Sequence, residues 1–367
     1  MEVTPWDVKG EIDYKKLIEE FGTEALNDEI LERIEKHAGE LHLFLKRKLF
    51  FSHRDLKWLF DEYEKGNKFY LYTGRGPSGK THIGHLITWI FTKWMQDKFD
   101  AELWFQMTDD EKFLFKKLEL EETINYAHDN ALDVIAVGFD PKKTKIFLDT
   151  EYSKTLYPQA LKVAKKITFS TAKAVFGFTN ENNIGQIFFT SMQSVPAFLP
   201  SVLKGKNIPC LIPYAIDQDP HFRVCRDVLP KLGYYKPAAI HSIFLPGLSK
   251  GGKMSASDPY SAIFTTDDKA TVKKKVGRAF TGGKESIEEQ KKCGGNPEVC
   301  SVFKYLYMLF EDDDNLLKER EEKCKSGGIL CGECKQYLTE KINKFLEEHQ
   351  KKREEAKKVV EKFMVRD

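Results

Sequence analysis

The sequence predicts an α/β fold built on a doubly wound parallel sheet, and three observations support this. Residues 69–73 form a short run of aromatic and β-branched side chains that ends at Gly74, as expected for a buried parallel strand. Apolar residues at helical spacing follow from Ile83 to Met95. Similar short apolar runs at 101–107, 145–148, 210–214 and 239–245 lead into polar or glycine-rich residues, as at the ligand-binding edge of such sheets.

Length and composition indicate a protein with more than one globular part. The chain has 367 residues, of which 41% are hydrophobic, and a formal net charge of +2 that neither requires nor excludes nucleic acid. It contains no apolar run of about 18 residues, which a membrane span would need, and it begins without a secretory signal pattern. We therefore expect a cytoplasmic protein.

The helical patterns divide the chain into three segments. Residues 1–66 are predicted to form a helical extension, in which a helix begins at His53-Arg54-Asp55. Residues 67–267 would form the sheet domain, with a helix at 121–137 and an aromatic-rich helical insertion at about 150–200 that we expect to form a dimer surface. Residues 268–367 are predicted to be helical, with apolar stripes at 302–310 and 337–349.

Seven cysteines are present, an odd number that favours reduced thiols over a disulfide framework. Cys331 and Cys334, with Cys324 upstream, suggest half a zinc site or a redox pair. Because no second CxxC motif or well-spaced histidine completes the set, we expect structural thiols.

Two motifs overlap between the first strand and its helix. Residues 74–81 satisfy the phosphate-loop pattern G-x-x-x-x-G-K-[ST], in which Lys80 would bind phosphates and Thr81 a magnesium ion. Residues 82–85, His-Ile-Gly-His, are the HIGH signature of class I aminoacyl-tRNA synthetases. Two histidines three positions apart lie on one helical face, near a helix start that favours anions.

Later strand ends decide between these two interpretations. Asp109 and Asp110 follow the second strand, and residues 217–219 follow the fourth. Residues 253–257, Lys-Met-Ser-Ala-Ser, follow the fifth strand and match the second signature of class I synthetases, KMSxS. A lysine and hydroxyls on a glycine-hinged loop are suited to stabilise charge that develops on a polyphosphate.

With both signatures in order, the chain resembles the tryptophanyl-tRNA synthetases of the eukaryotic and archaeal type over nearly its whole length. Further blocks that carry the resemblance are residues 5–6, 12–14, 16–18, 51–55, 70–77, 106–112, 215–220 and 310–314. The resemblance implies a Rossmann-like catalytic domain, a helical C-terminal domain that reads the anticodon, a homodimer, and the use of ATP with Mg²⁺, tryptophan and its tRNA.

The resemblance also implies roles for individual residues. Tyr72 and Gln106 would meet the indole N–H, and Phe222 would pack on the ring. Glu111, Gln193 and Gln218 would hold the α-amino group. The nucleotide positions are Arg75, Gly76, His82, Gly84, His85, Lys112, Lys253, Met254 and Ser255, of which His82, His85, Lys112 and Lys253 would be catalytic. No protein side chain is assigned as a metal ligand.

Three other functions remain open at this stage. A tyrosyl-tRNA synthetase has the same fold but would need an aspartate or tyrosine pair for the phenol. A phosphate-loop NTPase accounts for residues 74–81 but leaves residues 253–257 unexplained. A non-enzymatic RNA-binding scaffold leaves all the polar residues at the strand ends unexplained.

Overall fold

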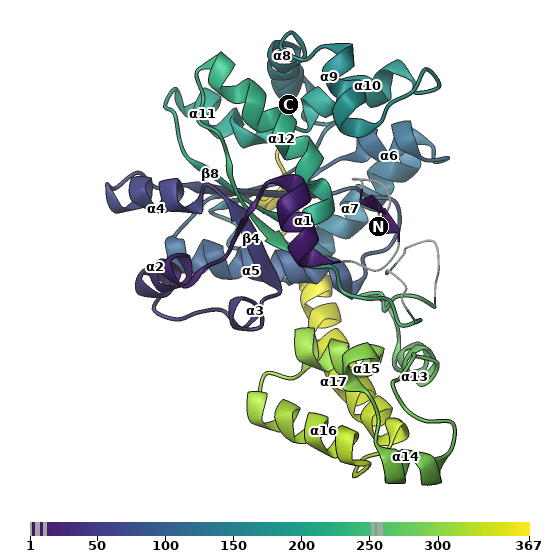
Figure 1. Cartoon of the computed structure of the whole chain (residues 1–367). Coiled ribbons are helices and arrows are strands. Elements are labelled where there is room, and N and C mark those ends of the chain that lie inside the picture. Colours follow the sequence, from purple (N-terminus) through teal and green to yellow (C-terminus); the bar gives the residue numbers. More distant parts are fainter. Residues whose placement is uncertain (1, 4–7, 10–12, 251–253, 255–259) are drawn as a thin grey trace.

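The computed structural model describes residues 2–3, 8–9, 13–250, 254 and 260–367, and Lys253 and Ser255 lie outside these ranges. Its centre is a seven-stranded sheet of order β3-β4-β9-β8-β5-β6-β7, with helices on both faces (Figure 1). The mixed α/β architecture predicted from the sequence is confirmed. A separate antiparallel pair joins β1 (Glu2–Val3) to β2 (Val8–Lys9).

All five parallel strands predicted from apolar runs are present, and they are mutually adjacent in the sheet. Their side chains are almost entirely buried on both faces, which explains why the runs are continuously apolar rather than alternating. The strands are β5 (Tyr70–Arg75), β6 (Leu103–Met107), β7 (Thr144–Leu148), β8 (Cys210–Ala215) and β9 (Ala238–Ser242).

The first 66 residues are not only helical, which corrects the sequence prediction. They add β3 (Glu24–Ala25) and β4 (Phe50–Arg54), which are antiparallel and extend the sheet beyond β9. His53 and Arg54 therefore belong to a strand rather than a helix. Asp55 takes a left-handed backbone conformation, with φ of 54°, and the next helix begins only at Leu56.

Helices of the N-terminal half surround this sheet. Helix α5 buries the predicted stripe, including Ile83, Leu86, Ile87, Phe91 and Met95. The helices are α1 (Tyr14–Phe21), α2 (Asp28–Ala38), α3 (Leu43–Lys46), α4 (Leu56–Glu64), α5 (Ile83–Phe99), α6 (Asp109–Phe115) and α7 (Leu120–Ala136).

The predicted insertion is helical and forms a core of its own against one face of the sheet (Figure 1). Phe176, Phe178, Phe189 and Phe198 are buried in that core, whereas Phe169 remains 48% exposed. The elements from here to β9 are α8 (Ser153–Ala164), α9 (Phe169–Phe176), α10 (Ile184–Met192), η1 (Val195–Ala197), α11 (Leu199–Lys204), η2 (Ile216–Gln218), α12 (Asp219–Val228) and η3 (Leu229–Leu232).

Residues 269–362 are mainly helical, as predicted, and α13 to α17 extend away from the sheet (Figure 1). The residues of the predicted stripe at 302–310 are buried in the core or packed against it, although the second half of this segment is a π-helix. The elements are α13 (Lys269–Gly277), α14 (Ile287–Cys293), η4 (Pro297–Val299), α15 (Ser301–Tyr305), the π-helical η5 (Leu306–Phe310), α16 (Asp314–Ser326), α17 (Cys331–Ala356) and η6 (Val360–Lys362).

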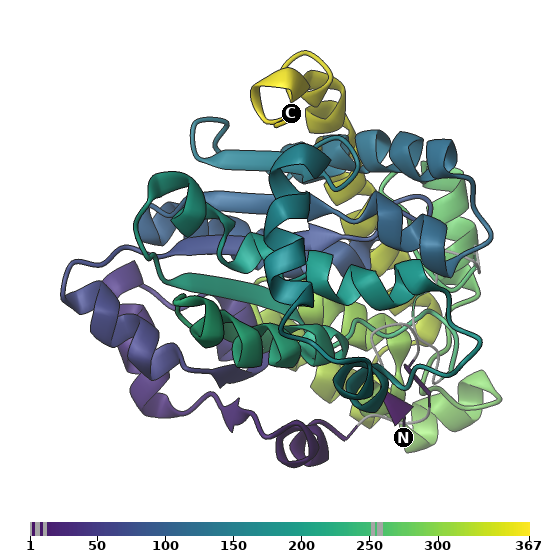
Figure 2. The same cartoon turned by 90° about the horizontal axis from the view of Figure 1, so that it is seen from above.

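After α17 the chain returns to the sheet and covers the edge of β7. The Ile146 N–H donates to the Phe363 carbonyl at 2.8 Å, and the Val365 N–H donates to the Ile146 carbonyl at 2.8 Å. Figure 2 shows this segment in yellow at one edge of the sheet, opposite the purple N-terminal elements. Two segments distant in sequence therefore flank the parallel strands.

In the part of the chain that the structure describes, no helix is long and apolar enough to cross a membrane.

Candidate active site

A cavity of about 270 Å³ opens at the carboxyl edge of the parallel strands, where the sequence places its polar residues. It is lined by residues of β5, β8 and β9, by Thr108 directly after β6, and by residues of α5, α6 and α12. Of the predicted site residues that the structure describes, all but Gln106 line it, namely Tyr72, Arg75, Gly76, His82, Gly84, His85, Glu111, Lys112, Gln193, Gln218, Phe222 and Met254.

One end of the cavity is an aromatic slot with a hydrogen-bonded polar wall. The Tyr72 hydroxyl donates to Gln106 Oε1 at 2.5 Å and accepts from Gln193 Nε2 at 2.8 Å. The ring of Phe222 packs edge-on to Tyr72, with centroids 5.8 Å apart. Gln106 thus lies behind Tyr72 rather than on the cavity surface, and Gln193 lies beside both.

Asp149 fixes the orientation of this polar wall, and the sequence analysis did not identify it. Both Asp149 carboxylate oxygens accept from Gln106 Nε2 at 2.9 Å. Because both Asp149 oxygens lie at the amide nitrogen, Gln106 Oε1 faces the Tyr72 hydroxyl, which donates to it. The signal available in the sequence was only the position of Asp149 directly after β7.

Next to the slot lies a buried pair of opposite charges on α6. Lys112 Nζ contacts Glu111 Oε1 at 2.7 Å, and the Thr108 hydroxyl donates to Glu111 Oε2 at 2.7 Å. Burial alone would raise the pKa of Glu111, but the charge of Lys112 and these hydrogen bonds lower it below its ordinary value. Glu111 is therefore an anion at neutral pH, positioned to receive a cation.

Gly76 allows Lys112 to reach this position. A Cβ atom at Gly76 would lie 2.0 Å from Lys112 Cε and 2.9 Å from Glu111 Oε2. Any side chain at residue 76 would displace the lysine and disturb its pairing with the carboxylate.

Arg75, at the end of β5, carries hydrogen-bond donors that the protein does not use. Its Nη1 donates to the Gly76 carbonyl at 2.5 Å, whereas its Nε and Nη2 are buried without a hydrogen-bond partner. Burial lowers the pKa of Arg75 to about 10, against the opposing charges of Glu111 and Asp133. A buried cation with unused donors indicates a site for an anionic ligand.

The two histidines of the HIGH motif stack at the start of α5, with ring centroids 3.6 Å apart. The His82 N–H donates to His85 Nδ1 at 3.1 Å, which orients the second ring. A Cβ at Gly84 would lie 3.0 Å from His82 Nδ1 and 3.0 Å from Met254 Sδ. Met254 is 5% exposed, so this residue of the KMSAS motif packs directly on the HIGH motif.

The chain after the KMSAS motif pairs with the segment that carries the HIGH motif. The Ile83 N–H donates to the Ile263 carbonyl and the Thr265 N–H to the Thr81 carbonyl, both at 3.0 Å. Gln350 of α17 donates in turn to the Thr265 carbonyl at 2.9 Å. This contact connects the C-terminal helices to the cavity rim.

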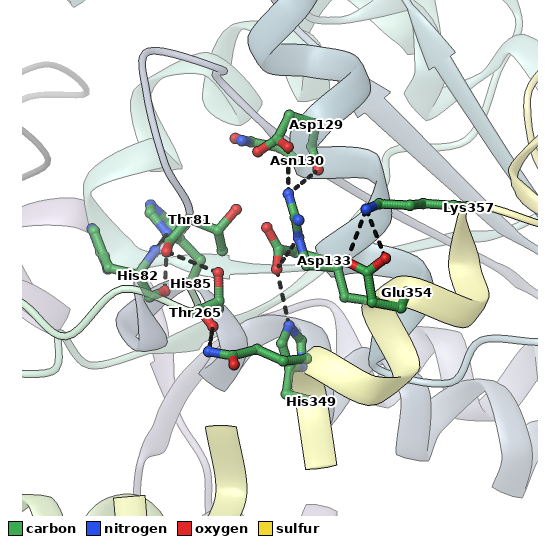
Figure 3. Close-up of polar contacts among 12 residues, drawn as sticks. Thr81, His82, His85, Asp129, Asn130, Asp133, Thr265, His349, Glu354 and Lys357 are labelled. Carbon is green, nitrogen blue, oxygen red and sulfur yellow. Dashed lines mark hydrogen bonds and ion pairs between the residues drawn. The ribbon is translucent and has the colours of Figure 1, made fainter. Parts of the chain in front are cut away.

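Figure 3 shows this rim next to a second polar contact between α17 and α7. Asp133 is fully buried, and its Oδ1 lies 3.0 Å from His349 Nε2 and 3.2 Å from Arg353 Nε. Arg353 also pairs with Asp129. Asn130, on the same helix, donates to the Gly79 carbonyl at 3.1 Å, so α7 supports the glycine-rich turn as well.

The phosphate-loop interpretation does not agree with this geometry. Lys80 is exposed and does not line the cavity, and α5 begins after His82 rather than at Lys80. In a phosphate loop the helix would begin at the motif and direct its lysine toward the ligand. The arrangement of Gly74, Gly79 and Lys80 therefore differs from that of a phosphate loop.

Asp110 and Asp149 form a buried acidic pair behind the slot, and we expect it to make stability depend on pH. Burial, joined by the charge of Asp109, raises the pKa of Asp110 to about 7 from an ordinary 3.8, and burial also raises the pKa of Asp149. The folded state binds this proton more tightly than the unfolded state does. The bound proton therefore stabilises the fold at low pH, and this contribution is lost as the pH rises toward 7. Between pH 5 and 8 the free energy of unfolding should fall by about 2–3 kcal/mol relative to Asp110→Asn.

Urea unfolding of both proteins across this range measures the difference directly. Parallel pH profiles for the wild type and Asp110→Asn would show that Asp110 does not take up a proton on folding.

Comparison with known proteins agrees with this site. Residues 64–347 match the family described as tRNA synthetases class I (W and Y). The tryptophan–tRNA ligase of Thermococcus onnurineus is 55% identical over 98% of this chain and 93% of its own. The tryptophanyl-tRNA synthetase structure from Plasmodium falciparum superposes with a TM-score of 0.87 at 42% identity, covering 94% of each chain.

A solved tryptophanyl-tRNA synthetase from Encephalitozoon cuniculi, bound to tryptophan, has a TM-score of 0.87 at 39% identity and covers 98% of this chain and 99% of its own. These similarities span the sheet, the insertion and the C-terminal helices together. The chain belongs to the class I tRNA synthetases of the W and Y family.

Proposed function

We propose that this protein is an ATP-dependent tryptophan–tRNA ligase, which forms tryptophanyl adenylate and transfers tryptophan to tRNA. The observation that carries the proposal is the polar wall of Tyr72 and Gln106, oriented by Asp149 inside an aromatic slot. The names of the similar proteins support the same substrate.

The slot matches the chemistry of an indole. Indole offers one N–H donor and no acceptor, so its site needs an acceptor between apolar walls. The Tyr72 oxygen, whose hydrogen is held by Gln106 Oε1, supplies the acceptor, and Phe222 supplies an apolar wall. The tyrosine alternative is disfavoured, because the similar proteins are named as tryptophan enzymes.

The rest of the cavity suits the ammonium group and the nucleotide. We assign the ammonium of tryptophan to anionic Glu111, with Gln218 and Gln193 as amide partners. Arg75, Lys112, His82 and His85 form a nitrogen-rich rim for the phosphates, and Gly76 and Gly84 leave room for the nucleotide. Tryptophan's carboxylate would then attack the α-phosphate, with pyrophosphate leaving toward the KMSAS motif.

In the second step, a ribose hydroxyl at the 3′ end of tRNA attacks the adenylate carbonyl and AMP leaves. No covalent bond to the enzyme forms, so positioning and electrostatics account for the rate. Mg²⁺ would enter with ATP, because the described rim consists of cationic and imidazole nitrogens, and no group of three His, Cys, Asp or Glu among the described residues is placed to hold a metal ion.

Lys253 and Lys80 provide a paired test of the two overlapping motifs. We expect Lys253→Ala to nearly abolish adenylate formation, by about 100-fold or more, because it removes a cation that opposes charge on the leaving pyrophosphate. Lys80 is exposed and outside the cavity lining, so Lys80→Ala should reduce the rate only modestly. Steady-state exchange kinetics measure both, and an indispensable Lys80 would contradict the proposal.

Amino-acid-dependent exchange of pyrophosphate into ATP, measured separately with each standard amino acid, tests the proposed function itself. Tryptophan alone should support exchange. Exchange with tyrosine would favour the related tyrosine enzyme, and γ-phosphate release without any amino acid would indicate a nucleotide hydrolase.

We further propose a cytoplasmic homodimer whose insertion forms the subunit contact and whose helices α13–α17 bind the anticodon arm. Ile184 of α10 is 85% exposed, and Phe169 of α9 is 48% exposed. Exposed apolar side chains of this size are typical of a surface that a partner subunit covers. Light scattering should give twice the chain mass, and Ile184→Asp should shift the protein toward monomer if this surface is the contact.

A further inference from the structure

Two sets of hydrogen bonds begin on β4, in the N-terminal extension, and both end on the carboxylate of Asp219. Asp219 is fully buried and does not line the cavity, but it is the first residue of α12. Gln218 precedes it and Phe222 follows one helical turn later, and both of these line the cavity. The position of Asp219 therefore determines where two groups that we assign to tryptophan lie.

The first set is a paired contact from Arg54, at the end of β4. Its Nε donates to Asp219 Oδ1 at 2.8 Å, and its Nη2 donates to Asp219 Oδ2 at 2.9 Å. A paired contact of this kind fixes the plane of the carboxylate as well as its distance, which a lysine cannot do. The side chain of Arg54 is only 12% exposed, so water competes little for its donors.

The same guanidinium group is also held by the end of α1. Arg54 Nη1 donates to the Gly22 carbonyl at 3.0 Å, and Nη2 donates to the Phe21 carbonyl at 2.5 Å. The last carbonyls of a helix have no partner within the helix and carry partial negative charge, so they suit a cation. Arg54 thus joins the C-terminal end of α1 to the N-terminal end of α12, and Figure 1 shows these two helices side by side.

The second set is a chain of hydrogen bonds through a buried histidine. The Ser52 hydroxyl lies 2.8 Å from Nδ1 of the fully buried His241. The other ring nitrogen of His241, Nε2, lies 3.0 Å from the Tyr214 hydroxyl oxygen. The Tyr214 hydroxyl donates in turn to Asp219 Oδ1 at 3.1 Å.

This chain has one direction. Burial lowers the pKa of His241 to about 3, so its ring is neutral and carries a single hydrogen. Because the Tyr214 hydrogen points to Asp219, the His241 hydrogen lies on Nε2 and is donated to the Tyr214 oxygen. His241 Nδ1 is then an acceptor, and the Ser52 hydroxyl donates to it. Every donor in the chain points toward Asp219.

Both β4 and α1 also support the cavity wall. Tyr214, the last hydroxyl of the chain, lines the cavity, and its ring stacks on Phe222 with centroids 4.5 Å apart. Tyr14, the first residue of α1, accepts from the N–H of Phe244 at 3.0 Å, and Phe244 lines the cavity as well. The N-terminal extension is therefore packed directly behind the site.

On the basis of the proposed ligase function, on which this inference rests, we propose that Arg54 is a positioning residue for tryptophan. It does not line the cavity, and it acts through Asp219 on Gln218 and Phe222. The nucleotide positions that the structure describes lie on or next to β5, α5 and α6, and at Met254. A change at Arg54 therefore weakens the binding of tryptophan and leaves that of ATP unaffected.

The variant Arg54→Lys of the full chain provides the test, because lysine keeps the charge and loses the paired contact. In tryptophan-dependent exchange of pyrophosphate into ATP, KM for tryptophan should rise by about 10-fold. Calorimetry with tryptophan alone should show the same rise in its dissociation constant. KM for ATP should stay within about twofold of the wild-type value, because its site shares no partner with Arg54.

The partner residue gives a second measure of the same contact. Because Arg54 and Asp219 act as a pair, combining Arg54→Lys with Asp219→Asn should raise KM for tryptophan no further than the larger single change does.

Arg33 supplies a matched control that joins two helices outside the cavity. Its side chain is 16% exposed, its Nη2 donates to Asp61 Oδ1 at 2.9 Å, and its Nη1 donates to the Lys57 carbonyl at 3.2 Å. It thus connects α2 to α4 and does not line the cavity. Arg33→Lys should lower the midpoint of urea unfolding, as Arg54→Lys does, and leave both KM values unchanged.

Ser52→Ala is a milder change in the same network and serves if Arg54→Lys does not fold. Without the Ser52 hydroxyl, His241 can carry its hydrogen on Nδ1, and Tyr214 can then donate to His241 instead of Asp219. The dissociation constant for tryptophan should rise by about threefold.

An unchanged dissociation constant for tryptophan in the folded variants would overturn the inference, as would equal increases in KM for tryptophan and for ATP. Either result would leave Arg54 as a residue that serves only the fold. If the wild-type protein itself binds no tryptophan, the proposed function fails first, and the positioning role fails with it.

Discussion

Replacing Arg75 with alanine is expected to lower tryptophan-dependent exchange by about 100- to 1,000-fold without lowering the free energy of unfolding. The loss of rate follows from removing hydrogen-bond donors that face a developing charge. Stability should be unchanged or higher, because the Nε and Nη2 atoms of Arg75 are buried without partners in the free protein. Exchange kinetics and urea unfolding measure the two effects.

Arg47 is a matched control, because it is a buried arginine whose donors have hydrogen-bond partners within the protein. Its Nη1 donates to the Tyr307 carbonyl at 2.6 Å, and its Nε donates to Asp314 at 3.0 Å. Arg47→Ala should lower the free energy of unfolding by about 1–3 kcal/mol and leave exchange nearly unchanged. If Arg75→Ala instead behaves like Arg47→Ala, Arg75 serves the fold and not the ligand.

Replacing Gln106 with leucine is expected to lower kcat/KM for tryptophan by about 100-fold or more. The substitution removes the acceptor that Asp149 orients and that holds the Tyr72 hydrogen, so the Tyr72 oxygen is no longer fixed to accept the indole N–H. A buried polar group that loses its partner costs about 1–3 kcal/mol. The selectivity of this variant for tryptophan over analogues without an N–H should fall as well. The ratio of kcat/KM for tryptophan to that for its benzothiophene analogue, which lacks the N–H, should decrease by a similar factor.

Gln96 supplies the comparison for this substitution. It is a buried glutamine on α5 whose amide pairs with Thr144 at 2.9 Å and with the Asp140 N–H at 3.0 Å, and it does not line the cavity. Gln96→Leu should therefore reduce stability and leave the selectivity ratio unchanged. An unchanged ratio in Gln106→Leu would show that the slot recognises tryptophan by shape alone.

The parallel half of the fold was predictable because its strands are buried on both faces. Continuous apolar runs such as 101–107 leave little choice of structure, and each predicted run is a strand in the sheet. Strand β4, in contrast, could not be predicted. It is an antiparallel strand of mixed composition, and its pairing partner, β9, lies almost 200 residues away in sequence, a separation that local periodicity cannot report.

The residues that line the cavity could be predicted from sequence motifs, whereas the residues that hold them in position could not. The HIGH and KMSAS motifs place residues at strand ends, so the cavity lining followed from the sequence. Asp149 orients the amide of Gln106, and Gln350 donates a hydrogen bond to the Thr265 carbonyl. Such side chains act through partners that only the folded chain brings close.

The strap that residues 363–365 form along β7 has a consequence for how the protein is made. During synthesis the chain emerges from residue 1 onward, so Ile146 leaves the ribosome well before the carbonyl and N–H groups that pair with it at Phe363 and Val365. Until then the outer edge of β7 presents unpaired backbone groups, the feature that leads sheets to associate with other chains. The nascent protein should be most prone to aggregation during this interval, and nearly full-length truncations should share that weakness although they retain every residue of the cavity.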